Sequence, residues 1–227
     1  MENILQTAIS VTGGLTKWKS YSLATAQIRT SGLWAEGGDQ QTATGFRFIA
    51  ALGQQSGEFL DYPAPGQRIV FKAGQLAVLT KAGDIFSPGS PAENKNGLLK
   101  ILNFKSYALW TTLTFPFSVT LKGYQTEETG THYYDGKTLE SLMVTDTTLA
   151  DYKIIGFFFT PDGLLSKADY EPEALGALPL TQLVYDYREF DGIMIPTKAR
   201  IYPRNTDGSP FKDTLLLGFD IDSAAFR

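Results

Sequence analysis

The sequence predicts a mainly β protein: one curved antiparallel sheet, a half-open β-barrel of about 11–12 strands, with two main helices, one of them inserted at the concave side. Most of the chain consists of short runs of alternating apolar and polar residues separated by turn signals, which is typical of consecutive hairpins. A helix-length apolar run, "LLKILNFKSYALWTTLTFPF" at Leu98–Phe117, interrupts the strands. No repeat or linker divides the 227 residues, so we expect a single domain over 1–227.

The composition excludes several classes of protein. Hydrophobic residues make up 43% of the chain, which indicates a globular protein rather than a disordered one. A net charge of −4 without a basic patch argues against a nucleic-acid partner. Because the sequence contains no cysteine, disulfides, thiol nucleophiles and thiolate metal sites are excluded. It has no dinucleotide-binding, phosphate-binding or zinc-protease motif, so we expect neither a cofactor nor a metal.

The first predicted element is a short amphipathic helix over residues 2–11, which ends at Gly13–Gly14 and is followed by Trp18 packed beneath it. Strands then dominate, with a tight hairpin at Ala73–Gly74 and the most loop-like stretch at 84–97. Alternation predicts strands over 21–30, 42–50, 67–73, 75–80, 118–128, 139–146, 152–159, 164–171, 180–190, 193–203 and 214–221.

The second helix, Leu98–Leu113, carries apolar residues on two sides and should end before Pro116. Two apolar arcs on the helix surface imply that the helix contacts other groups on two sides, as it would in the mouth of a curved sheet. Such a helix either fills the barrel as solid core or lines a ligand cavity. The broad arc contains Leu98, Leu99, Leu102, Leu109, Trp110 and Leu113, the narrow arc contains Ile101, Phe104 and Ala108, and Lys100, Asn103, Thr111, Lys105 and Thr112 separate them.

The same segment is the nearest approach to a membrane span, but Lys100, Lys105 and Pro116 make insertion unfavourable. The N-terminus "MENILQTAIS" has neither a basic start nor a long apolar stretch, so it does not read as a secretory signal. We therefore expect a cytoplasmic location, or a periplasmic one if a signal peptide has been removed.

Two hypotheses follow for function. The first is binding of a hydrophobic or amphiphilic small molecule, a lipid or an apolar metabolite, in the concave cavity, because aromatic side chains are abundant. Its candidate ligand-binding residues are Trp110, Tyr107, Phe104, Phe46, Phe48, Phe157 and Tyr185. The alternative is a cofactor-independent enzyme of the cyclase or isomerase type, with Arg188 holding an anion and Glu127, Tyr170 and Tyr187 transferring protons.

The strand "YDYREF" leaves one question of orientation open. Alternation places Tyr185, Tyr187 and Glu189 on one face and Asp186 with Arg188 on the other. If Asp186 and Arg188 face inward, Arg188 can hold a ligand carboxylate. If they face outward, they belong to an ordinary cross-strand ladder of charges.

Two further features remain ambiguous. The strand "IIGFFF" is apolar on both faces, so its second face needs a helix or a partner subunit to cover it, and a homodimer is possible. The single histidine, His132, is interpreted as a surface residue beside a turn rather than as a general base. The neighbouring Glu127, Glu128 and Asp135 are interpreted as solvated hairpin charges rather than as metal ligands.

Four stretches, "GGLTKWKS", "SYALWTTLTFPF", "DYREFDGIMIPTKARIYP" and "LLLGFDIDSAAF", resemble a family of uncharacterised bacterial proteins. The order of a helix ending in Gly-Gly, a long antiparallel run and an inserted helix is similar to the superfamily of LolA and LppX lipoprotein carriers. That resemblance implies a half-open β-barrel whose concave face, covered by helices, holds acyl chains. VioE, a cofactor-free enzyme of violacein biosynthesis, has the same fold, so the resemblance implies a cavity without deciding between carrier and catalyst.

Overall fold

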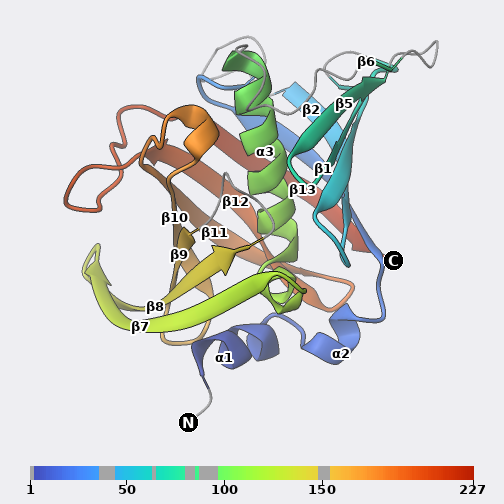
Figure 1. Ribbon diagram of the computed structural model, residues 1–227. Coiled ribbons are helices and arrows are strands. Elements are labelled where there is room, and N and C mark those ends of the chain that lie inside the picture. The colour runs from blue at the N-terminus through green and yellow to red at the C-terminus, as the bar shows by residue number, and fades with distance from the viewer. Residues whose placement is uncertain (1–2, 36–43, 63–64, 80–84, 87–96, 148–153) are drawn as a thin grey trace.

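The computed structural model describes residues 3–35, 44–62, 65–79, 85–86, 97–147 and 154–227 (Figure 1). Its helices are α1 (Ile4–Val11), α2 (Leu15–Trp18) and α3 (Gly97–Thr114), with 3₁₀ turns η1 (Phe117–Thr120) and η3 (Glu173–Leu175). Its strands are β1 (Leu23–Ser31), β2 (Thr44–Ala51), β3 (Ser56–Leu60), β4 (Arg68–Lys72), β5 (Gln75–Leu79), β6 (Ile85–Phe86), β7 (Tyr124–Tyr134), β8 (Lys137–Asp146), β9 (Ile154–Phe159), β10 (Leu165–Tyr170), β11 (Leu180–Phe190), β12 (Ile193–Pro203) and β13 (Leu217–Phe226).

All of these strands belong to one antiparallel sheet, in the order β6-β5-β4-β3-β2-β1-β13-β12-β11-β10-β9-β8-β7. The sheet therefore consists of two meanders, joined where β1 pairs with β13. It is open, because β6 and β7 form its two edges. These edge strands are consecutive in the chain, so the segment between them has to cross the whole concave side. Helix α3 lies in that segment and stands across the concave face of the sheet (Figure 1).

The predicted fold class is confirmed, with thirteen strands in the part of the chain that the structure describes rather than about 11–12. The sequence patterns missed β3 and the two-residue strand β6. The strand predicted over 118–128 begins later, at Tyr124, because residues 117–120 form the turn η1. The last strand, predicted over 214–221, runs from Leu217 to Phe226. Most of the loop predicted over 84–97 lies outside the described residues.

Helix α3 is buried on all sides, as its two apolar arcs predicted. Every residue from Leu102 to Thr114 is buried. The indole Nε1 of Trp110 donates a hydrogen bond of 2.9 Å to the carbonyl oxygen of Ala51, at the end of β2. A helix enclosed in this way must also satisfy its polar side chains internally. Three of its hydroxyl groups do so by donating to the carbonyl oxygen four residues earlier, those of Ser106, Thr112 and Thr114.

Helix α1 covers the end of the concave side where α3 finishes (Figure 1). The side chain of Asn3 caps α1 by accepting a hydrogen bond from the backbone N–H of Gln6. The backbone N–H of Ile4 donates to a carboxylate oxygen of Glu128 on β7, over 2.9 Å. Beyond α1, the indole of Trp18 stacks on the ring of Phe117, with centroids 4.4 Å apart. Trp18 is therefore buried against η1 and β13.

The apolar convex side of β9 is covered within the chain. The ring of Phe158 lies 5.0 Å from that of His132 on β7 and 4.5 Å from the Nζ atom of Lys167. Lys167 also contacts the ring of Tyr134 and forms an ion pair of 3.0 Å with Asp169. Strand β7 thus supplies cover for which the sequence suggested a helix or a partner subunit. No helix among the described residues is long and apolar enough to cross a membrane.

We predict that Trp110→Phe lowers the free energy of unfolding by roughly 1–3 kcal/mol, because it leaves the partly buried carbonyl of Ala51 without its donor. Chemical denaturation measures the change. Leu33→Ala is the control: its side chain is 45% exposed, so the change should stay within about 0.5 kcal/mol. Equal stabilities of W110F and the parent chain would contradict this role of Trp110.

Candidate functional site

A pocket lies beneath α1, between the C-terminal half of α3 and the concave face of β9 to β12. It leaves about 20 Å³ for the centres of water-sized molecules, which is room for about one water. In this structure the pocket is therefore closed to a larger ligand. Its lining residues are Ala8, Thr12, Thr111, Thr112, Phe115, Pro116, Phe159, Gly163, Leu165, Tyr170, Gln182, Val184, Tyr187 and Pro196.

One wall of the pocket is a chain of hydrogen bonds that links the sheet to α3. The hydroxyl of Tyr170 donates to the Oε1 atom of Gln182 over 2.9 Å. The Nε2 atom of Gln182 donates to the hydroxyl of Thr112, also over 2.9 Å, and Thr112 donates to the carbonyl of Ala108. Because all of these groups are buried, the chain fixes the side chain of Gln182 at the pocket wall.

Thr111 differs from the other buried hydroxyl residues of α3. Its side-chain oxygen has no hydrogen-bond partner, although the residue is only 5% exposed and lines the pocket. A buried hydroxyl without a partner costs about 1–3 kcal/mol, so such groups are rare and mark places where a water or a ligand binds. Thr111 therefore presents an unused donor and acceptor at the pocket.

The pocket has no charged side chain in its lining. Its two ionisable groups are phenols. Burial raises the pKa of Tyr170, and the negative charge of Asp169 raises it further. Burial also raises the pKa of Tyr187, as does the charge of Asp162, and the Tyr187 hydroxyl donates to the carbonyl of Leu165. Both phenols therefore stay protonated and neutral far above neutral pH.

Tyr187 and Tyr185 lie on opposite faces of β11, not on one face as simple alternation predicts. The backbone of Asp186 has a φ of 56°, in the left-handed region, which interrupts the alternation between them. Val184 and Tyr187, three residues apart, consequently line the same pocket. Tyr185 lies on the convex face opposite Lys198 and is 37% exposed, so it faces away from the pocket.

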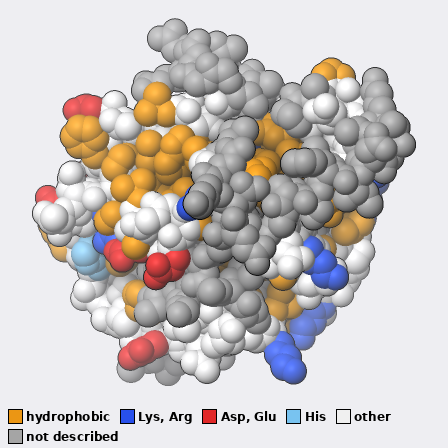
Figure 2. Space-filling view, turned by 45° about the horizontal axis from the view of Figure 1, so that its top comes forward, with side chains coloured by type: hydrophobic (Ala, Val, Ile, Leu, Met, Phe, Trp, Pro, Cys, Tyr) orange, Lys and Arg blue, Asp and Glu red, His pale blue; other side chains and the backbone are white. Residues whose placement is uncertain are grey.

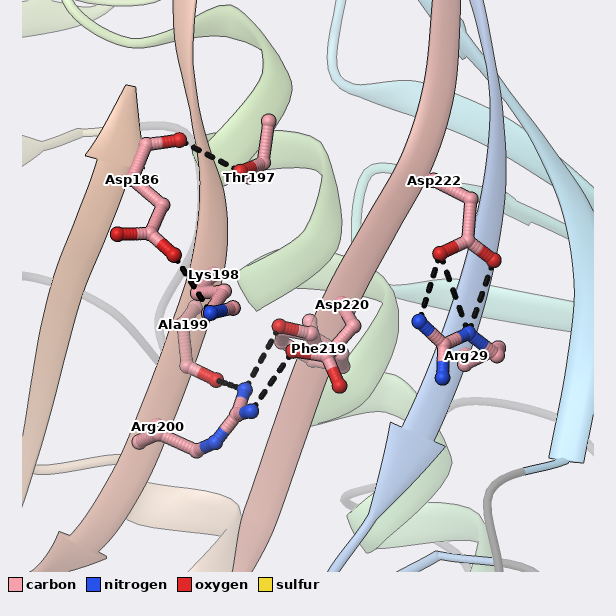
Figure 3. Close-up of polar contacts among 9 residues, drawn as sticks. All are labelled: Arg29, Asp186, Thr197, Lys198, Ala199, Arg200, Phe219, Asp220 and Asp222. Atoms are coloured by element: carbon pink, nitrogen blue, oxygen red, sulfur yellow. Dashed lines mark hydrogen bonds and ion pairs between the residues drawn. The ribbon is translucent and has the colours of Figure 1, made fainter. Parts of the chain in front are cut away.

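Figure 3 shows the charged side chains on the convex face of β11, β12, β13 and β1. Lys198 pairs with Asp186 over 2.5 Å, and the guanidinium of Arg200 donates to Asp220 over 2.7 Å. Arg29 on β1 holds Asp222 on β13 through both carboxylate oxygens. Asp186 thus belongs to an ordinary cross-strand ladder, one of the two alternatives that the sequence left open.

Of the four residues proposed for catalysis, only two reach the pocket. Tyr170 and Tyr187 line it, whereas Arg188 is exposed on β11 beyond Asp186. Glu127 is exposed on the edge strand β7. The structure therefore does not bring the four side chains together.

The remaining predicted ligand-binding aromatics are buried around α3 and do not line the pocket. Phe104 lies edge-on to Trp34 and Tyr170, with both pairs of centroids 5.9 Å apart. Phe157 stacks on Phe115 at 4.0 Å. Phe48 packs against Phe59 and Phe71, Phe46 packs against Phe59 and Tyr62, and Tyr107 and Trp110 are buried on the helix itself. They form the aromatic core that holds α3 in place.

A buried cation lies in this core, nearer the start of α3. The Nζ atom of Lys105 lies 4.9 Å from the ring centre of Phe46 and 4.5 Å from that of Tyr62. It also donates a hydrogen bond of 3.0 Å to the Tyr62 hydroxyl. These contacts explain how a residue predicted to separate two apolar arcs is buried at 1% exposure.

Sequence reasoning missed most of the pocket. Thr111 and Thr112 were recognised only as residues that separate the apolar arcs of α3, and that position between two buried faces was the available signal. Gln182 carried no signal, since a polar residue in a strand normally faces solvent. Ala8 and Thr12 are placed by the docking of α1, which no local pattern reports.

The opposite end of the molecule carries exposed apolar residues. Leu178 is 37% exposed and Phe211 is 45% exposed, in the connections that follow β10 and β12. Those connections lie side by side, since the backbone N–H of Arg204 donates to the carbonyl of Pro179. Figure 2 shows hydrophobic side chains gathered at this end. They lie far from the pocket beneath α1.

We predict that Thr111→Val raises the free energy of unfolding by about 1 kcal/mol, because valine keeps the shape and removes a buried hydroxyl without a partner. Thr112→Val is the matched comparison and should lower it by about 1–2 kcal/mol, because Gln182 loses its acceptor. Urea denaturation of the two variants measures both changes. Similar destabilisation of both would mean that a bound water already satisfies Thr111.

No protein-family model matches the sequence, and no curated protein matches it. The fold, in contrast, matches solved structures. A domain assigned to an outer membrane lipoprotein-sorting protein of Vibrio parahaemolyticus superposes with a TM-score of 0.62 at 12% identity, over 99% of this chain and 91% of that one. A LolA superfamily protein of Nitrosomonas europaea gives 0.60 at 14% identity, over 98% and 92% of the two chains.

A protein of the DUF1329 family from Desulfovibrio piger superposes with a TM-score of 0.62 at 13% identity, over 98% of this chain and 91% of that one. All three matches cover nearly the whole of both chains, so they concern the complete sheet together with its helices. The chain therefore has the LolA-like fold that its sequence resemblance predicted.

Proposed function

We propose that this protein binds a hydrophobic or amphiphilic small molecule on the concave side of its sheet, in the pocket beneath α1. The observation that carries the proposal is the pocket itself, which joins an apolar lining to a few fixed polar groups. Phe115, Phe159, Leu165 and Val184 provide the apolar lining, and Thr111 and Gln182 provide polar groups. This combination suits a ligand with an apolar body and a polar end.

Helix α1 is the element whose movement admits such a ligand. Ile4 and Ala8 of α1 are buried, and Leu5 and Ile9 are half-buried against the core, so lifting the helix costs on the order of several kcal/mol of apolar burial. Gly13 and Gly14 follow it with φ values of 121° and 84°, and glycine tolerates changes of backbone angle. Trp18 beyond them stays fixed on Phe117. Helix α1 thus closes the pocket, and Gly13 and Gly14 form its hinge.

Binding fits the pocket better than general-base catalysis does. A general base works best when its pKa lies near the working pH. The pKa values of both pocket phenols are raised, so Tyr170 and Tyr187 hold their protons and serve as neutral hydrogen-bonding groups. The similar structures support the same function, since one is assigned to a lipoprotein-sorting protein and another to the LolA superfamily.

We predict that the protein binds Nile red, an uncharged apolar dye, with a blue shift and an increase of the dye's fluorescence. The variant Thr7→Cys with Gly163→Cys tests the role of α1, because the chain has no other cysteine. A Cβ atom at Gly163 would lie 2.9 Å from the Cγ2 atom of Thr7, close to the roughly 3 Å between a Cβ atom and the far sulfur of a disulfide. The oxidised variant holds α1 closed and should lose dye binding.

The reduced form of the same variant is the control and should bind the dye, because it carries the same substitutions without the disulfide. Native mass spectrometry of gently purified protein provides a second measurement, in which we expect a retained apolar molecule. A parent chain that binds neither dye nor any retained molecule would refute the proposed function. Equal dye binding by the oxidised and reduced forms would place the ligand elsewhere on the protein.

A further inference from the structure

We propose that the pocket beneath α1 selects amphiphiles with a neutral polar end, a hydroxyl or a carbonyl group, and that Thr111 is the hydrogen-bond partner of that end. The inference rests on the proposed function and names the chemical class of its ligand. It depends on two observations: the pocket lining contains no charged side chain, and Thr111 has a buried hydroxyl without a partner.

Because the pocket lining contains no charged side chain, it disfavours a ligand whose polar end is ionic. A carboxylate or an ammonium group loses its water when it enters a buried site, and this loss is large unless an opposite charge compensates it. The polar groups in the lining belong to Thr12, Thr111, Thr112, Tyr170, Gln182 and Tyr187, and all of them are neutral. Asp169 and Asp162, whose charges raise the pKa values of the two phenols, are not lining residues, and Asp169 is held by Lys167 and Thr181.

The hydrogen bonds already formed in the wall leave Thr111 as the available partner. The hydroxyl of Thr12 donates to the carbonyl of Ala8, that of Tyr187 to Leu165, and that of Tyr170 to Gln182. Thr112 both donates and accepts. A hydroxyl such as that of Thr111 can donate to a ligand carbonyl, or donate to and accept from a ligand hydroxyl.

The apolar part of the ligand then lies toward α1. Thr111 belongs to α3, whereas Ala8 lies across the pocket on α1. Leu165 and Phe159 border the turn at Gly163, and Gly163 lies against Thr7 of α1. When α1 lifts, an apolar chain that starts at Thr111 leaves along this apolar border.

The test compares 1-decanol, decanoate and decylammonium, which share one chain length, as competitors of bound Nile red at pH 8, where both ionic probes are charged. We expect 1-decanol to bind at least tenfold more tightly than either ionic probe. Thr111→Val should weaken the binding of 1-decanol about three- to tenfold, because it removes one hydrogen bond. The affinity of each variant for Nile red is measured directly, so that the competition data are corrected for any change in dye binding.

Two further variants control for changes in the helix itself. Thr111→Ser keeps the hydroxyl and should bind 1-decanol like the parent chain. Thr114→Val makes the same substitution one turn along α3, at a hydroxyl that bonds to Trp110 and does not line the pocket, and should not change binding. Crystals of the 1-decanol complex should show the ligand oxygen within hydrogen-bond distance of the Thr111 hydroxyl.

The outcomes separate this inference from the proposed function. If Nile red binds but decanoate competes as well as 1-decanol, or T111V binds 1-decanol like the parent chain, the inference is wrong and the function stands. A water found at Thr111 in the 1-decanol complex also overturns the inference. If neither the dye nor any of the three probes binds, the proposed function fails and the inference fails with it.

Discussion

The pairing of β1 with β13 is the constraint on which the rest of this structure depends. It joins the first and last strands of the chain, so the two meanders extend away from the junction in opposite directions. The edge strands β6 and β7 are then consecutive in the chain but far apart in space, and α3 has to bridge them across the concave side. The bidentate contact of Arg29 with Asp222 supports this junction on the convex face.

A helix that bridges an open sheet in this way is buried on every side, and its polar residues need partners. Ser106, Thr112 and Thr114 bond to the helix backbone, and Lys105 lies among aromatic rings and bonds to Tyr62. The Nδ2 atom of Asn103 and the hydroxyl of Thr111 have no hydrogen-bond partner, and of these two residues Thr111 lines the pocket. The polar character of the pocket thus follows from the burial of α3. The pocket wall consists of neutral polar groups, whose hydrogen bonds the enclosed helix and strand β11 can supply.

The pocket is closed in this structure, so a ligand can reach it only if a covering element moves. A solid aromatic core holds α3 from the sheet side, so the space beside it opens only where the covering element is weakly held. In the proposed function helix α1 is that element, because it is followed by two glycines, whereas Trp18 beyond them is stacked on Phe117. Under the proposed function, ligand entry beneath α1 would leave the core around Phe104 and Phe157 undisturbed.

The sequence by itself determined the single antiparallel sheet, the N-terminal helix and the enclosed second helix, because periods of 2 and 3.6 residues report directly which faces are buried. It could not determine that Tyr185 and Tyr187 lie on opposite faces, since one left-handed residue, Asp186, reverses the alternation. Nor could it distinguish a core aromatic such as Trp110 from a pocket residue such as Gln182. That distinction depends on where α1 and α3 dock against the sheet, and docking arises from contacts between residues far apart in the chain. Tertiary structure alone therefore decided that Thr111 and Gln182 line the pocket, whereas the aromatic residues predicted to bind the ligand do not.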